Sequence, residues 1–183
     1  ESGKAEVLQI SQVPSPIFTS GSYADQLKAI NKGRIFILKK SPMPLIGSID
    51  WDVNEHGRYY STQLHAFAGV GHLLKSKNKL DKKIEKNIAE LIVKWGRCIA
   101  NNSRAGNRAW YEGTVVKRLG TLLQTLNYFR RHNALGSLKY EELLYLIDKN
   151  AMHLLDTEGV CSFGNHGIRQ DIMLAATALH LPK

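Results

Sequence analysis

The residues with the clearest chemical capability lie near the C-terminus, in the run Gly164-Asn165-His166-Gly167. Asn165 can donate and accept hydrogen bonds without carrying charge, and His166 titrates near neutral pH. The glycines on both sides allow a ligand to approach the backbone closely. The pair therefore predicts a polar site at the start of a helix. The alternative is that Asn165 caps the helix and His166 is an ordinary histidine.

An apolar stripe at helical spacing follows this pair and predicts a helix that is buried along one face. The stripe consists of Ile168, Ile172, Ala175, Ala176 and Leu179.

A second candidate stretch precedes another predicted helix. Trp110 and Tyr111 can stack on a flat ligand such as a sugar face, and Arg118 can hold a carboxylate through two parallel hydrogen bonds. We therefore predict that these three residues line a groove. The alternative is that Trp110 packs against its own helix and Arg118 faces water.

A third stretch, residues 49–65, concentrates aromatic, histidine and arginine side chains where a loop enters a helix. Binding residues often collect on loops that a rigid scaffold supports. We assign His56 and Tyr60 to the same groove on this basis. The alternative is that Trp51 and Tyr60 are ordinary packing residues.

The elements that must position these stretches are amphipathic helices. We expect a short helix over 22–31, a short strand over 34–38, and a helix from Arg58 to about Leu74. Three more helices are marked by apolar residues, the second of them with Thr114 as its cap. Their stripes run through Ile84, Ile88, Leu91, Ile92, Trp95 and Ile99; Val115, Leu119, Leu122, Leu123 and Leu126; and Leu143, Leu146, Ile147, Leu154 and Leu155.

Short connections make successive helices antiparallel neighbours. We therefore predict an all-α fold, either a helical bundle or an array of helical hairpins curved into part of a toroid. Residues 1–48 would form an irregular N-terminal segment, and residues 49–183 the helical domain.

The composition suggests an anionic partner. Lys plus Arg number 25 and Asp plus Glu number 16, so the net charge of the 183-residue chain is 25 − 16 = +9.

No apolar run reaches the roughly 20 residues that span a bilayer, so no membrane partner is predicted. Cys98 and Cys161 are either bridged or packed as buried thiols. We predict no cofactor.

The three stretches together resemble the heparinase II/III-like polysaccharide lyases, with alginate lyases as more distant relatives. The matching parts are Ile49-Asp50-Trp51 with the helix through Gln63-Leu64-His65, the Trp110 to Leu119 segment, and Gly164-Asn165-His166-Gly167 with its helix. The resemblance covers roughly residues 49–180. It implies an incomplete α/α toroid and β-elimination on acidic, uronate-containing polysaccharide.

The resemblance also implies roles for two residues. The family's Asn neutralises the uronate carboxylate, which stabilises the enolate-like transition state, and Asn165 is the matching position. The family's adjacent His matches His166, which would orient the site or assist proton transfer. Family lyases also use a Tyr after this pair, but only 17 residues follow His166 (183 − 166) and none is Tyr. We therefore expect the chain to be the N-terminal piece of a longer lyase; the alternative is a degenerate relative of the family. Family membership favours secretion or the periplasm and leaves the cytoplasm open.

Three other interpretations stay open. A glycoside hydrolase would need two carboxylates, for which the chain offers Asp52, Glu55, Glu112 and Asp171.

A helical domain that binds nucleic acid or another anionic polymer without catalysis is favoured by the basic residues of the chain. They are the run Lys75, Lys77, Lys79, Lys82, Lys83 and Lys86, together with Arg104, Arg108, Arg130 and Arg131. The run also suits a solvated helix face, and no helix-turn-helix or RNA-binding motif accompanies it, so nucleic acid ranks below polysaccharide. His65 and His72 could share a helix face, but without a third ligand we predict no metal site.

Overall fold

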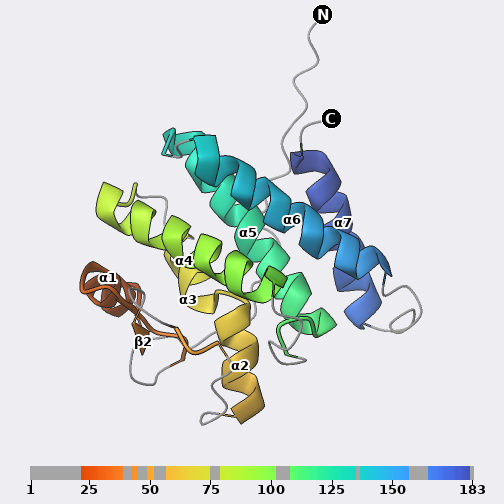
Figure 1. Cartoon of the computed structure of the whole chain (residues 1–183), viewed down its shortest axis with the longest axis horizontal. Coiled ribbons are helices and arrows are strands. Elements are labelled where there is room, and N and C mark those ends of the chain that lie inside the picture. The colour runs from red at the N-terminus through yellow and green to blue at the C-terminus, as the bar shows by residue number, and fades with distance from the viewer. Residues whose placement is uncertain are drawn as a thin grey trace, which may run out of the picture.

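A computed structural model describes residues 22–38, 43–44, 49–51, 57–74, 79–101, 108–134, 137–156 and 165–181 of the chain. These residues form helices and one short antiparallel strand pair, which confirms the all-α prediction (Figure 1). The elements in chain order are α1 (Tyr23–Asn31), β1 (Arg34–Ile35), β2 (Met43–Pro44), α2 (Gly57–His65), α3 (Ala68–Leu74), α4 (Lys82–Asn101), α5 (Glu112–His132), α6 (Ser137–Asp156) and α7 (Asn165–His180).

The longer helices are arranged in two layers that run in opposite directions. In one layer α4 and α6 are parallel. Two ion pairs show this: Glu90 pairs with Lys139, and further along both helices Arg97 pairs with Glu142. The other layer holds α3, α5 and α7, where α5 packs against both of its neighbours (Figure 1). Alternating layers of this kind are what successive helical hairpins produce. The arrangement agrees with the predicted all-α fold of successive helical hairpins.

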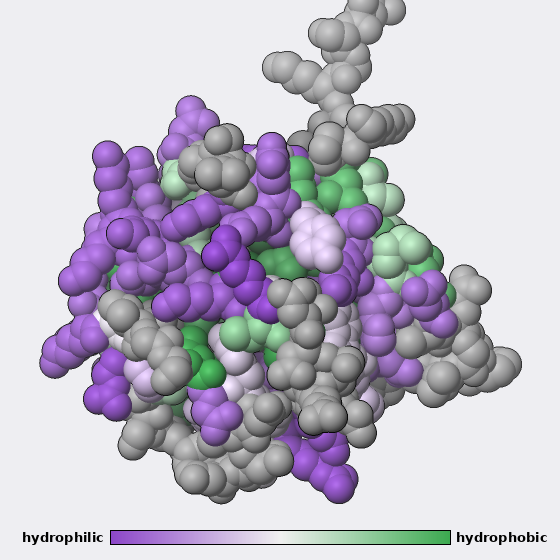
Figure 2. Space-filling model, in the orientation of Figure 1, coloured by the Kyte–Doolittle hydropathy of each residue, from purple (hydrophilic) through white to green (hydrophobic). Residues whose placement is uncertain are grey.

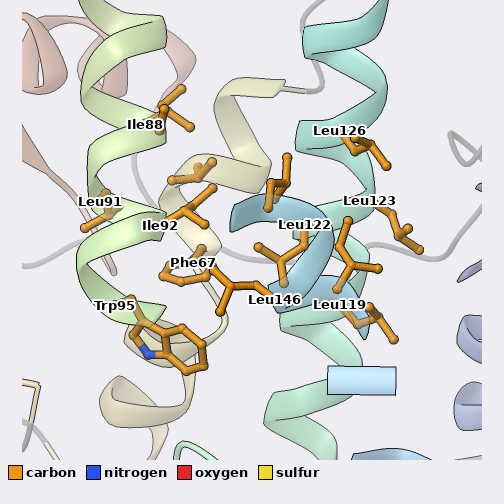
Figure 3. Close-up of a cluster of buried hydrophobic side chains, with 14 of the residues drawn as sticks. Phe67, Ile88, Leu91, Ile92, Trp95, Leu119, Leu122, Leu123, Leu126 and Leu146 are labelled. Carbon is orange, nitrogen blue, oxygen red and sulfur yellow. The ribbon is translucent and has the colours of Figure 1, made fainter. Parts of the chain in front are cut away.

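The core lies around α5 and holds the apolar stripes predicted for α4 and α5. Side chains from both helices meet, with Phe67 and Leu146 among them (Figure 3). Every stripe residue of these two helices is buried. Of the α6 stripe, only Leu155 is exposed, at 42%. The 3.6-residue period therefore predicted the inward faces of three helices almost completely.

The segment before residue 39 joins the same core. The Ser22 hydroxyl accepts a hydrogen bond from the Asp25 amide, and the Asp25 carboxylate accepts one from the Ser22 amide, so the two residues cap α1, which lies within the helix expected over 22–31. The Gln26 side chain then donates to and accepts from the Phe36 backbone, so α1 holds the chain that leaves β1. The segment 22–38 is thus fastened to the helical array.

The single helix predicted from Arg58 to about Leu74 is instead two helices, α2 and α3. The break falls at Phe67, whose φ of 54° lies in the left-handed region that costs a non-glycine residue about 1 kcal/mol or more. The break turns the Phe67 ring into the core, where its edge meets Trp95 at a centroid distance of 5.5 Å. Burial of this ring offsets the backbone cost.

Most of the stripe predicted to bury α7 is exposed. Ile168, Ile172 and Leu179 are 61%, 47% and 65% exposed, and Ala176 alone of the stripe is partly buried against the core. The buried residues of the helix include Thr177 and Met173, which lies beside Gly120 of α5. Between Ile172 and Leu179 the helix has no charged residue on any side. The apolar pattern therefore could not choose the inward face, and the packing of α5 chose it.

Two local predictions are also wrong. Thr114 does not cap α5, which begins one turn earlier with Tyr111 at the N-cap position and no side-chain cap bond. Cys98 is a free and exposed thiol rather than a buried one, while Cys161 lies outside the described residues. Within the part of the chain that the structure describes, none of the helices has the length and apolarity needed to cross a membrane.

Candidate functional site at the start of α5 and α7

The first turns of α5 and α7 lie side by side because the two helices are parallel. Lys117 lies close enough to Arg169 for their charges to repel, and a Cβ on Gly120 would lie 3.6 Å from Met173. Further along, Arg130 Nη1 donates to the His180 carbonyl at 2.9 Å. One turn before Lys117 and Arg169 are the starts of the two helices (Figure 1). The structure thus brings the stretch that ends at Tyr111 to the same end of the molecule as the backbone of Asn165 and His166.

The Trp110-Tyr111 stretch presents one aromatic ring to solvent and one to the interior. Tyr111 is 47% exposed, and its ring lies over Gly113, with Cε1 3.1 Å from where a Cβ would be. The Arg108 guanidinium lies 5.8 Å from the centre of that ring. An exposed ring beside a cation can hold a sugar face and an acidic group together. Trp110 is half-buried and packs inward against Trp95.

Arg118 was predicted in the groove, and the structure instead buries it completely. Its Nε donates to Asn150 Oδ1 at 2.8 Å, and its Nη1 donates to the carbonyls of Ala109 and His65 at 2.6 and 3.2 Å. The guanidinium also lies 4.2 Å from the ring of Trp95. Arg118 therefore joins the end of α2, the segment before α5 and the middle of α6.

Burial lowers the pKa of Arg118 to about 9, so the side chain is still charged at neutral pH. Among the described residues, no carboxylate forms an ion pair with it. The backbone carbonyl oxygens and the electron-rich faces of the tryptophan rings stabilise the positive guanidinium in place of a counter-ion. Burial and the charge of Arg169 also lower the pKa of Lys117, so these two basic side chains lie near each other beside the start of α7.

Several buried polar atoms on α2 and α5 have no hydrogen-bond partner in the described part of the chain. They include both amide atoms of Gln63, the Thr114 hydroxyl and Nη2 of Arg118. Native proteins leave few such atoms unpaired, and water, an ion or a functional role usually accounts for them. Gln63 and Thr114 thus mark the junction of these two helices as polar.

The other predicted site residues are either buried in the core or lie where the structure does not describe their side chains. Tyr60 is buried on α2, where burial raises the pKa of its phenol, so the structure supports the packing alternative for it. Trp51 is buried too, stacked on His65 at a centroid distance of 6.2 Å. His56 lies outside the described residues. Asn165 and His166 open α7, and only their backbone is described.

Two residues of α6 belong to this end of the molecule and were missed in the sequence. His153 Nε2 is 2.9 Å from the Trp110 carbonyl, and the two rings are 4.9 Å apart. Asn150 is fully buried, accepts from Arg118 and donates to the Leu146 carbonyl at 2.6 Å. Their three-residue spacing puts both on one helix face, but that spacing alone does not reveal which neighbour they face.

Of the two histidines considered for a metal, His65 has a hydrogen-bond partner inside the core. His65 is buried and its Nδ1 accepts a hydrogen bond from Trp95 Nε1 at 3.1 Å. Across the described ranges, no three His, Cys, Asp or Glu side chains are grouped as a metal would need.

Comparison with known proteins adds no relative. No family model matches the chain, and neither the curated proteins nor the solved structures give a match.

Proposed function

We propose that this chain belongs to a protein that cleaves acidic, uronate-containing polysaccharide by β-elimination at the start of α5 and α7. One observation carries the proposal: parallel packing puts the Trp110-Tyr111 stretch beside the start of α7, where Asn165 and His166 lie. These stretches are more than fifty residues apart in the chain. Residues that serve one substrate must meet in space in this way.

The chemistry requires a neutralised carboxylate and a proton acceptor. In β-elimination the base takes the C5 proton, a C4–C5 double bond forms, and the C4–O bond breaks. The departing oxygen takes up a proton and leaves as a hydroxyl. Asn165 would donate to the uronate carboxylate, which stabilises the negative charge that develops there. His166 would assist the proton transfer.

The surroundings favour a polyanionic substrate. Arg108 and Arg169 are positive side chains at this end, and Lys117 adds a third charge between α5 and α7. Tyr111 offers its exposed ring to a sugar face. Arg118 supports the site from the interior, and the proposal does not require it to touch the substrate.

The test is the growth of ultraviolet absorbance on a panel of uronate polysaccharides, since elimination makes a conjugated unsaturated uronate and hydrolysis does not. It is run on this chain and on any longer natural protein that contains it. We expect Asn165→Ala to lower kcat by about 10²- to 10³-fold, the usual effect of losing one donor to a developing anion. Gln170→Ala, which removes an amide from the next part of the same helix, should keep full activity. Absence of elimination on every polymer, or equal rates for Asn165→Ala and the parent, would refute the proposal.

A further inference from the structure

A basic face lies on the opposite side of the molecule from the start of α7. It consists of the exposed side chains of Lys28, Lys32, Arg34, Lys79, Lys82, Lys83 and Lys86. Figure 2 shows hydrophilic residues gathered over this side, where Figure 1 places α1 and the first half of α4. The two parts of the face are about fifty residues apart in the chain. The Asn87 side chain holds them together by donating to the Ile30 carbonyl at 3.4 Å.

The acidic residues of the same elements are fewer than the seven cations of the face. Asp25 accepts hydrogen bonds from both the amide and the hydroxyl of Ser22 at the start of α1, and Asp81 Oδ1 accepts from the Ile84 amide at the start of α4; both carboxylates stay exposed. Glu85 is buried and accepts from the Tyr128 hydroxyl at 2.9 Å. Lys86 forms an exposed ion pair with Glu90, which is long at 3.9 Å. The seven cations outnumber the exposed Asp25 and Asp81 and the half-buried Glu90, so the outward charge is positive.

The lysines at the start of α4 are not explained by helix stability. Lys82 and Lys83 are in the first turn, where the helix dipole is positive. Each cation there costs about 0.3–1 kcal/mol at an exposed site. Residues that cost stability and remain exposed are candidates for binding rather than folding.

We propose that the basic face binds an acidic polysaccharide, as a surface separate from the candidate site at α5 and α7. The face is almost entirely lysine, which binds as a point charge and suits spaced sulfates or carboxylates. Base recognition in nucleic acid relies on Arg, Asn, Gln or stacked aromatic rings, and among the exposed described residues of α1, β1 and the start of α4 only Asn31 and Arg34 are of these kinds. The choice of polysaccharide rests on the proposed function.

The test measures binding of fluorescently labelled heparin fragments over a range of salt concentrations. The face variant is Lys32→Gln/Lys82→Gln/Lys83→Gln. The control is Lys94→Gln/Arg131→Gln/Lys149→Gln, which removes the same charge from elsewhere on the described surface. Each contact with a dense polyanion contributes about 0.7–0.9 to the slope of log K against log salt. We expect the slope to fall by about 2 for the face variant and by less than about 0.5 for the control. Circular dichroism should show both variants folded.

Three results would overturn the inference. The first is equal loss in both variants, which would mean that net charge alone drives binding. The second is tighter binding of a duplex DNA than of heparin at equal salt, and the third is no binding of heparin at all. Gln170→Ala, which lies outside the basic face, should bind heparin as the parent does. A chain that binds through the face but cleaves no polymer would therefore refute the proposed lyase function and leave this surface standing.

Discussion

Replacement of Arg118 by Met tests whether the buried guanidinium supports the candidate site from within. Met roughly preserves the apolar stem of the side chain and removes the charge, so the change leaves only a limited cavity. The carbonyls of Ala109 and His65 and the Asn150 amide oxygen would lose their donor.

The expected cost follows from these three acceptors. Each buried acceptor left without a donor costs about 1–3 kcal/mol, and the lost contact with the Trp95 ring costs about 1 kcal/mol more. Removing a buried charge returns its desolvation penalty and offsets part of this sum. We expect Arg118→Met to lower the free energy of unfolding by about 3 kcal/mol, a large share of the roughly 5–15 kcal/mol that holds a domain together.

Urea denaturation followed by circular dichroism measures this change. A double-mutant cycle with Asn150→Ala should give a coupling of about 1.5–3 kcal/mol, because the two side chains share a charge-assisted hydrogen bond of 2.8 Å. A loss of less than about 1 kcal/mol for Arg118→Met would refute the internal role. If that variant were fully stable yet failed to bind polysaccharide, Arg118 would be a groove residue, as the sequence first suggested.

Two further predictions concern packing elsewhere in the fold. Gly69→Ala should destabilise the fold by about 1–3 kcal/mol, because a Cβ there would lie 2.6 Å from a backbone carbonyl oxygen. Gly57→Ala should cost only about 1 kcal/mol, because Gly57 has a φ of 78° but open space around it. Thermal unfolding of both variants measures the difference, and equal losses would contradict the steric argument. Burial raises the pKa of Tyr128 to about 12 from an unfolded value near 10, so its contribution to stability is complete below pH 10 and is lost between pH 10 and 12. A spectrophotometric titration should show one late tyrosinate that disappears in Tyr128→Phe, and a titration that ends near pH 10 would contradict it.

Much of the fold was predictable because helix faces repeat with a fixed period. The α4 and α5 stripes are buried as predicted, and α1 lies within the short helix expected over 22–31. These features depend on residues within a few positions of one another, so the sequence contains the information needed to predict them. Asn165, His166 and Tyr111 remain predicted site residues on the same basis, as local patterns next to helix starts.

The packing of helices against one another decided the rest. Local pattern cannot show that Arg118 points inward, because an arginine is usually exposed and its partners Ala109, His65 and Asn150 lie on three other segments. Nor can it choose the buried face of α7, which is apolar on nearly every side. The same packing sets α5 and α7 parallel and joins α1 to α4. The candidate site and the basic face therefore follow from contacts between distant segments, whereas the helices that carry them follow from the order of residues along each segment.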